Sequence, residues 1–173
     1  MQIVTRLSMS VDGYVTTPDG WPALIADPAF VSGQSHGFRE FQKRCEAVAM
    51  GRTTFEPALG NPRCPWPDLD VFVLGSNVST EGAAAPVATD SDRARLLETL
   101  RSTNRGGDVH RVGGPQTIET FRALGALDKL GLLVVPVLLG GGTRLTPTLS
   151  TETQLVLESS LPGGTVEIIY ACN

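Results

Sequence analysis

The sequence predicts an α/β fold in which helices cover a central mixed sheet. Short apolar runs typical of strands alternate with segments of helical apolar spacing over most of the chain. The most apolar run, residues 127–139, predicts a buried strand at the centre of a sheet. The last two apolar segments, 153–160 and 165–172, flank Pro162-Gly163-Gly164 and predict an antiparallel hairpin. Together these observations predict a three-layer α/β sandwich that forms one domain over residues 1–173.

The first part of the chain begins with an apolar run that predicts a strand, followed by a turn at Gly13. A segment rich in proline, glycine and aspartate then predicts a long loop, and such loops often have a function. Phe38, Phe41 and Cys45 recur at spacings of three and four and predict a helix. In chain order the expected elements are a strand at 2–9, a loop at 16–31, a helix at 33–46, a strand at 47–50, a helix at 53–59 and a proline-rich loop at 60–69.

Capping residues indicate where the helices of the second part begin. Asp90 or Ser91 is expected to cap a leucine-rich helix, because its side chain can accept from free backbone N–H groups. Pro115 suits the first position of the next helix, because the N–H group of a residue at that position has no partner within the helix and proline lacks this group. In chain order the expected elements are a strand at 70–74, a short strand at 86–89, a helix to about residue 100, a strand at 108–112 and a helix at 115–124.

Composition excludes two classes of partner. There is no run of about 18 apolar residues, so we expect no membrane span. Residues 1–6 predict a strand rather than a signal peptide. The net charge of −4 argues against nucleic acid, because phosphate-backbone binding needs a basic face. We therefore expect a small-molecule partner and neither a nucleic acid nor a membrane.

Cysteine and histidine are too few to predict a metal site. Cys45, Cys64 and Cys172 are odd in number and widely spaced, so no disulfide framework or zinc motif is predicted. A reduced, cytoplasmic location is the expectation that follows. Cys64 is a candidate reactive thiol, although no neighbouring residue marks it as one. His36 and His110 are expected at surface or helix-cap positions.

Two glycine-containing corners follow predicted strands and precede predicted helices. Gly51-Arg52-Thr53-Thr54 would place a permanent cation and two hydroxyls at a helix start. Gly113-Gly114-Pro115 would let the backbone approach a ligand, with free N–H groups at the helix start. Both patterns are suited to phosphate; the alternative is a plain strand-to-helix turn at each. Two such corners on one sheet suggest a bound dinucleotide and therefore redox chemistry.

Two other glycine turns follow predicted strands. Gly75-Ser76-Asn77 could contact a ribose phosphate or an adenine edge, although a polar turn is the commoner outcome for such a sequence. Gly140-Gly141-Gly142 favours a tight turn.

The long loop supplies candidates for a substrate pocket. It carries Trp21 and Phe30 near Asp12, Asp19 and Asp27. A carboxylate beside aromatic side chains can have its pKa tuned by burial, as catalytic acids require. The alternative is a surface loop with a small apolar cluster.

Taken in order, these motifs resemble those of the dihydrofolate reductase-like superfamily. The segments that carry the resemblance are Ser10-Val11-Asp12-Gly13, Met50-Gly51-Arg52-Thr53-Thr54-Phe55-Glu56, Ser76-Asn77, Val112-Gly113-Gly114 and Pro136-Val137-Leu138-Leu139-Gly140-Gly141-Gly142. More narrowly, the chain is similar to stand-alone proteins like the C-terminal reductase domain of the bifunctional riboflavin biosynthesis deaminase/reductase. The resemblance covers nearly the whole chain. It implies a mostly parallel sheet with an antiparallel C-terminal edge, NADPH as cofactor, and a homodimer.

The resemblance also implies roles for individual residues. In the family, the position of Thr54 lies on the cofactor pyrophosphate, and those of Gly113 and Gly114 pack against it, often through a cis peptide. The positions of Ser76 and Asn77 lie at the adenosine 2′-phosphate. The full cofactor set implied is Ser8 and Val15 beside the nicotinamide, and Gly51, Arg52, Thr53, Thr54, Ser76, Asn77, Gly113, Gly114, Pro115, Gln116 and Thr117 along the phosphates and adenosine.

The chain departs from its relatives in three places. Dihydrofolate reductases often have a basic residue where Gln116 stands, which leaves Arg52 to recognise a 2′-phosphate. Their catalytic carboxylate corresponds to Asp27, with Glu40 as the alternative. Trp21-Pro22-Ala23 replaces the Trp-Ile-Thr stretch of the riboflavin reductase domain, and the deaminase motifs are absent, so a role in riboflavin synthesis is not expected.

The resemblance therefore implies an NADPH-dependent reductase that transfers hydride to a C=N or C=O bond of a small heterocyclic or sugar-like substrate. Asp27 is the expected catalytic residue, and Trp21 and Phe30 are expected to contact the substrate. Two alternatives stay open: a nucleotide-binding module of the same fold without turnover, and a non-enzymatic protein whose glycine corners are only turns.

Overall fold

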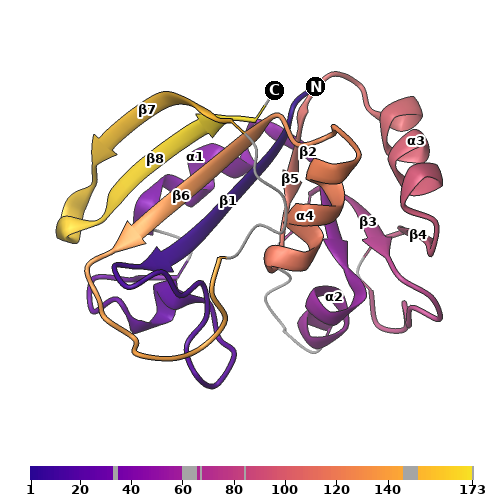
Figure 1. Ribbon diagram of the computed structural model, residues 1–173. Helices are drawn as coiled ribbons and strands as arrows, with labels where there is room; N and C mark the ends of the chain where they lie inside the picture. Colours follow the sequence, from indigo (N-terminus) through magenta and orange to yellow (C-terminus); the bar gives the residue numbers. More distant parts are fainter. Residues whose placement is uncertain (33–34, 60–65, 67, 84, 146–151, 173) are drawn as a thin grey trace.

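The chain forms an eight-stranded sheet with helices on both faces (Figure 1). The computed structural model describes residues 1–32, 35–59, 66, 68–83, 85–145 and 152–172. The strands are β1 (Ile3–Ser10), β2 (Cys45–Gly51), β3 (Asp70–Leu74), β4 (Val87–Asp90), β5 (Asp108–Arg111), β6 (Lys129–Val135), β7 (Gln154–Ser160) and β8 (Val166–Ala171). The helices are α1 (Phe38–Gln42), α2 (Arg52–Leu59), α3 (Arg93–Thr103) and α4 (Pro115–Ala123), with 3-10 turns η1 (Ala23–Ala26), η2 (Ser35–Gly37) and η3 (Pro162–Gly164).

The strands follow the order β4-β3-β2-β5-β1-β6-β8-β7, which places β1 between β5 and β6. All pairs from β4 to β6 are parallel, with Ile3 opposite Val109 and Ser10 opposite Val135. β8 runs antiparallel to both β6 and β7. The mostly parallel sheet with an antiparallel C-terminal hairpin is thus confirmed.

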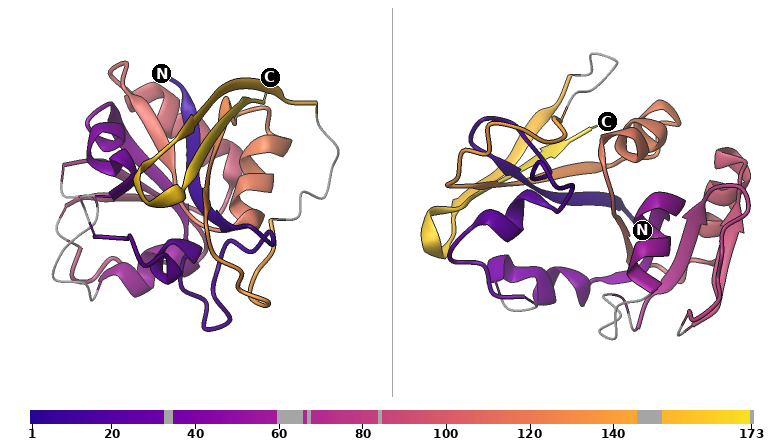
Figure 2. Two further views of the ribbon diagram at one scale, coloured as in Figure 1. Left: turned by 90° about the vertical axis from the view of Figure 1, so that its left-hand side faces the viewer. Right: turned by 90° about the horizontal axis from the view of Figure 1, so that it is seen from below.

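Each face of the sheet has its own helices. α3 and α4 cover one face, where Leu100 and Phe121 pack with Ile3 and Val109 in the largest core cluster. α1, α2 and η1 cover the other face, and Figure 2 shows α1 and α4 on opposite sides of β1 and β6. On that second face the packed pairs are Phe55 with Met50, Phe41 with Val4, and Leu24 with Val135. Within the described part of the chain, no helix is long and apolar enough to cross a membrane.

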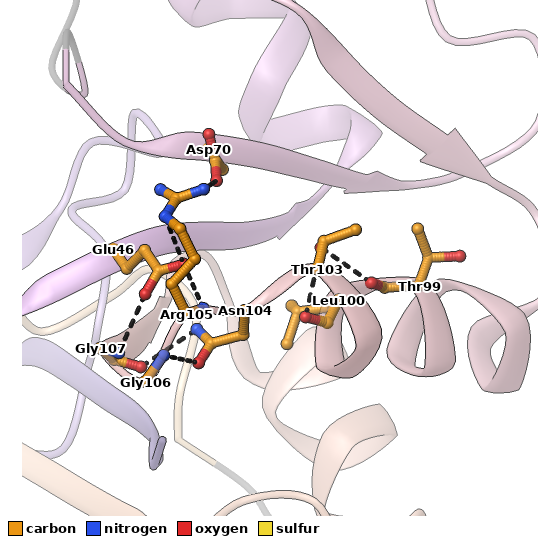
Figure 3. A network of polar contacts seen from close by, with 9 residues as sticks. All are labelled: Glu46, Asp70, Thr99, Leu100, Thr103, Asn104, Arg105, Gly106 and Gly107. Carbon is orange, nitrogen blue, oxygen red and sulfur yellow. Dashed lines mark hydrogen bonds and ion pairs between the residues drawn. The ribbon is translucent and has the colours of Figure 1, made fainter.

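Glu46, at the start of β2, forms hydrogen bonds with the turn before β5 (Figure 3). Its carboxylate accepts from the backbone N–H groups of Arg105, at 2.6 Å, and Gly107, at 2.9 Å. The Arg105 side chain lies 3.4 Å from the same carboxylate and 3.2 Å from that of Asp70. This network holds the amino ends of β2, β3 and β5 in register.

The C-terminal end predicted for the helix at 33–46 is wrong. α1 stops at Gln42, and Cys45 is already in β2, opposite Asp108. Cys45 continues the apolar spacing because it packs with Phe41 and Val4 from its place in a strand. The packing partner is the one expected, but the backbone is extended. Residues 33 and 34 lie outside the described part of the chain.

Two other boundaries also differ from prediction. The strand predicted at 127–139 ends at Val135, because Pro136 has no N–H for the ladder. The cap of α3 is Asp92, whose carboxylate accepts from Ala94 N and Arg95 N, rather than Asp90 or Ser91. The long loop at 16–31 contains η1, a single 3-10 turn that the sequence did not indicate.

Candidate functional site

Three neighbouring strands end at the same edge of the sheet. β3, β2 and β5 lie side by side and run parallel, so their carboxyl ends meet there. Gly51, Gly75 and Gly113 follow or close these strands. Ligands of open α/β sheets bind outside the carboxyl ends of the strands. The predicted cofactor residues on these strand ends are therefore brought together.

At this edge of the sheet, Gly51 and Gly113 are each closely packed against a threonine from the other strand-to-helix corner. A Cβ at Gly51 would lie 3.3 Å from Thr117 Oγ1, and one at Gly113 would lie 2.7 Å from Thr54 Oγ1. These contacts join the amino ends of α2 and α4. Thr117 of α4 lies against Gly51, and Thr54 of α2 lies against Gly113. The two corners form one continuous surface of backbone and small hydroxyl side chains.

The start of α4 offers free donors. Gly114 is its N-cap and has no side-chain cap bond. The backbone N–H groups of Gly113, Gly114 and Gln116 donate no hydrogen bond to any described residue. Free N–H groups at a helix start, with the partial positive charge of the helix dipole, suit an anion. The donor set therefore fits the pyrophosphate of a dinucleotide.

The loop after β3 is fixed beside α2. A Cβ at Gly75 would lie 2.9 Å from Arg52 Cβ, so the Arg52 side chain runs past this glycine. The N–H of Ser79 donates to Glu56 on α2 at 3.2 Å. Ser76 and Asn77 are exposed, and Asn77 has a φ of 52°. Arg52, Ser76 and Asn77 thus line one exposed end of the corner.

Arg111 lies beneath the Gly113–Gly114 turn and is 1% exposed. Its guanidinium donates to Thr5 Oγ1 at 2.9 Å and to the carbonyls of Val112 and Gly113 at 3.2 and 3.0 Å. Burial lowers its pKa to about 9. The sequence motifs did not indicate this residue; the available signal was a charged side chain at the end of a short strand that leads into a glycine pair.

Ser8 and Val15, predicted beside the nicotinamide, are buried at the carboxyl end of β1. Ser8 Oγ accepts from the N–H of Leu24 at 3.0 Å, which ties η1 to β1. Val15 pairs with Thr143 and Ala23 through its backbone. Both residues set the path of the long loop across the end of the sheet.

Asp12 joins the loops that follow β1 and β6. It accepts from Ser10 Oγ at 2.6 Å and from the N–H groups of Leu139 and Gly140 at 3.1 and 2.8 Å. These bonds, that of Ser10 foremost, lower its pKa to about 2. The tight turn predicted at 140–142 is confirmed, since Gly140 and Gly142 have φ of 65° and 116°. Asp12 therefore stabilises these two loops rather than serving as an acid in a substrate pocket.

Asp27, the predicted catalytic carboxylate, is buried at 4% exposure. Its Oδ1 accepts from the N–H of Ala29 at 2.9 Å, and its Oδ2 accepts from Thr165 Oγ1 at 3.3 Å. His36 Nε2 lies 3.3 Å from the same Oδ2. Both carboxylate oxygens therefore contact the protein itself. The alternative acid, Glu40, is exposed on α1.

The predicted substrate residues lie in different surroundings. Trp21 is 62% exposed on the long loop. Phe30 is half-buried and stacks on His36 with ring centroids 6.5 Å apart. Asp19 is exposed near Trp21. The structure thus separates Trp21, which is in solvent, from Phe30, which packs against the cluster of Ala23, Leu24 and Val135.

The two histidines were expected at surface or helix-cap positions, and the structure places neither at the surface. His36 and His110 are 7% and 4% exposed. Burial lowers the pKa of His110 to about 3, so its ring is neutral and packs edge-on against Phe41. Both lie in the layer between the sheet and α1, where the polar residues of β1 also gather.

Two further expectations can be compared with the structure. The peptide bonds between described residues, that of Gly113–Gly114 included, are all trans, so the cis peptide implied by the resemblance is wrong here. Among the described residues no three His, Cys, Asp or Glu side chains gather as a metal site would need. The thiol of Cys64 lies outside the described residues.

Comparison with known proteins gives consistent matches over the whole chain. The uncharacterised protein YwjB of Bacillus subtilis is 26% identical over 170 residues, which cover 96% of this chain and 95% of that protein. The uncharacterised protein YyaP of the same organism is 24% identical, over 99% of this chain and 95% of its own length.

Solved structures share the fold. A putative riboflavin biosynthesis protein from Shewanella sp. PV-4 superimposes with a TM-score of 0.83 at 21% identity, covering 100% of this chain and 99% of the other. The bifunctional diaminohydroxyphosphoribosylaminopyrimidine deaminase/5-amino-6-(5-phosphoribosylamino)uracil reductase of Thermotoga maritima gives 0.70 at 12% identity, with 99% of this chain matching 56% of that protein.

The family model described as the RibD C-terminal domain matches residues 2–167. That match spans the sheet from β1 into β8, including the strand ends that form the candidate site. Membership of this family supports a reductase-like role. The chain therefore belongs to the RibD C-terminal domain family, with the dihydrofolate reductase-like fold.

Proposed function

We propose that this protein is an NADPH-dependent reductase that transfers hydride to a C=N or C=O bond of a small heterocyclic or sugar-like substrate. The observation that carries the proposal is that Gly51, Gly75 and Gly113 come together at the carboxyl ends of β2, β3 and β5. Free N–H groups lie beside them at the start of α4. A dinucleotide has phosphates to match these donors. Family membership supports the same class of activity.

In this proposal the residues divide by the part of the cofactor they would hold. Thr54, Gly113 and Gly114 would bind the pyrophosphate, with Thr53 and Thr117 beside it. Arg52, Ser76 and Asn77 would bind the adenosine 2′-phosphate, since a guanidinium is suited to phosphate. The bound cofactor would supply the hydride. The chain itself would orient the two reactants and exclude water.

The first experiment is a titration of the protein with NADPH and with NADH, followed by tryptophan fluorescence and by thermal unfolding. Binding to the folded state alone raises its stability, by about 2.7 kcal/mol at a hundredfold excess over Kd. We expect saturable binding that is tighter for NADPH than for NADH. Absence of binding to either dinucleotide would overturn the proposal and favour a non-enzymatic role.

A second candidate function is a nucleotide-binding module without turnover. It is favoured by Asp27, because both of its carboxylate oxygens contact Ala29, Thr165 or His36 rather than an open site. If Asp27 supplies a proton in catalysis, Asp27→Asn should lower kcat while NADPH affinity stays the same. Tight NADPH binding with no turnover over a panel of heterocyclic and sugar-like substrates would favour the binding module.

A further inference from the structure

We propose that Arg111 is a positioning residue of the dinucleotide site: it holds the carbonyls of the Val112–Gly114 turn inward, so that the N–H groups of Gly113 and Gly114 face the pyrophosphate. This inference rests on the proposed function. It concerns a residue that lies under the proposed site and would act through the backbone of the turn.

The contacts of Arg111 are directed at the backbone of one turn. Nη1 donates to the carbonyl of Val112 at 3.2 Å and lies 3.4 Å from that of Gly114, while Nη2 donates to the carbonyl of Gly113 at 3.0 Å. Nε donates to Thr5 Oγ1 at 2.9 Å, and Thr5 is fully buried. The planar fork of donors is thus anchored on β1 and spans three successive carbonyls.

The orientation of the free donors follows from peptide geometry. In a trans peptide the carbonyl of one residue and the N–H of the next point in opposite directions. Both peptide bonds of this turn are trans. When Arg111 draws the carbonyls of Val112 and Gly113 inward, the N–H groups of Gly113 and Gly114 must face outward. Neither N–H donates a hydrogen bond to a described residue.

The charge of Arg111 gives a second reason. Its guanidinium is buried, and among the described residues it forms an ion pair with no carboxylate. An unpaired buried charge is costly, so such a charge is usually matched by an anion or by several hydrogen bonds. A pyrophosphate on the outer side of the turn would be that anion. A Cβ at Gly113 would lie 3.7 Å from Nη1, so the guanidinium lies directly against the glycine turn that would hold the pyrophosphate.

The test separates positioning from general stability. Arg111→Met removes the charge and the donors, and Arg111→Lys keeps the charge without the fork. Leu100→Ala is the matched control, because Leu100 is equally buried but lies on the core-facing side of α3. Affinities for NADPH and for adenosine 2′-monophosphate are measured by calorimetry, with urea unfolding for each variant. The second ligand has the 2′-phosphate but lacks the pyrophosphate.

We expect Arg111→Met to weaken NADPH by about 10-fold or more, equivalent to about 1.4 kcal/mol, with adenosine 2′-monophosphate unchanged. Arg111→Lys should weaken NADPH by a smaller factor. Leu100→Ala should lose stability and keep both affinities. If Arg111→Met does not fold, Arg111→Lys decides by the same comparison of ligands.

Three results would overturn the inference, and they can be told apart. If the natural chain binds NADPH and the Arg111 variants bind it equally well, Arg111 is structural only and the proposed function stands. If the natural chain binds no dinucleotide, the proposed function and this inference fail together. Equal losses for both ligands would also exclude an action on the pyrophosphate.

Discussion

Gly113 and Gly114 are neighbours with different physical requirements. Gly113 has a φ of 113°, and a Cβ there would lie 2.7 Å from Thr54 Oγ1. Gly114 has a φ of −78°, and a Cβ there would meet no atom within 4 Å. The fold therefore needs glycine at 113 but not at 114. A glycine that the fold does not need points to close approach by a ligand.

We predict that Gly114→Ala changes the free energy of unfolding by less than about 0.5 kcal/mol yet weakens NADPH by about 10-fold, because its Cβ would occupy the approach of the phosphate. Gly113→Ala should destabilise by about 1–3 kcal/mol from backbone strain and the Thr54 contact. Urea unfolding and calorimetry measure the two effects. Unchanged affinity in Gly114→Ala would remove the ligand from this turn.

Arg52 should decide which dinucleotide is preferred. It is exposed at the start of α2, beside the loop of Ser76 and Asn77. A hydrogen bond to a charged group contributes about 1.5–3 kcal/mol, so Arg52→Ala should weaken NADPH by about 10-fold or more. NADH affinity should change little, because NADH has no 2′-phosphate. Equal losses for the two dinucleotides would contradict this role.

At the scale of the secondary-structure elements, the carboxylate of Glu46 connects the start of β2 to the turn before β5. The hydrogen bond from Arg105 N is the largest cause that lowers the pKa of Glu46 below its usual range. A carboxylate with a lowered folded-state pKa stabilises the protein above its unfolded-state pKa, and this is lost as pH falls through the folded-state pKa. This connection is therefore strongest near neutral pH.

We predict that Glu46→Gln lowers the free energy of unfolding by about 1–3 kcal/mol at pH 7, since two backbone donors lose a charged acceptor. The difference between the two proteins should shrink as the pH falls below the unfolded-state pKa of about 4.3 and through the lowered folded-state pKa of Glu46, because the carboxylate is then protonated. Thermal unfolding from pH 3 to pH 7 measures this. A difference that does not depend on pH would show that charge is not the cause.

The start of α3 gives a prediction with a neighbouring control. Asp92→Ala should cost about 1 kcal/mol, because its carboxylate accepts from two free N–H groups of the first turn. Ser91→Ala removes one of the two caps that the sequence suggested, Asp90 being the other, and it should change stability very little. Urea unfolding of the two variants compares them directly. A larger loss in Ser91→Ala would contradict the observed cap.

Sequence predicted most strands and helices because their apolar spacing is local. It failed at Cys45, whose spacing from Phe41 is helical although the residue lies in a strand, since packing against Val4 satisfies both. The glycine corners were predicted because a strand end and a helix start are adjacent in sequence. The Asp27–Thr165 contact spans 138 residues, and nothing local to either residue indicates it. Arg111 depends likewise on Thr5, 106 residues away.

At the scale of the whole molecule, the homodimer implied by the resemblance stays a prediction. β7 forms one edge of the sheet and exposes Leu155, Val156 and Leu157 by 51, 53 and 41%. Exposed apolar edge strands tend to pair with another chain. We expect sedimentation equilibrium to give twice the chain mass of 18.3 kDa.

Val156→Lys should lower that mass to one chain, if the contact includes β7. Val11→Lys is the control, because Val11 is 62% exposed on a loop away from that edge. A single-chain mass at every concentration of the natural protein would contradict the dimer.

The place of β1 between β5 and β6 has a consequence for how the chain reaches its folded state. The first strand is made early, yet its neighbours begin only at Asp108 and Lys129. During synthesis β1 must wait unpaired, while β2, β3 and β4 can already pair with one another. Pairings so distant in sequence slow folding and prolong exposure to aggregation. A nascent chain that stalls before residue 108 would therefore be a natural client for a chaperone that binds extended apolar segments.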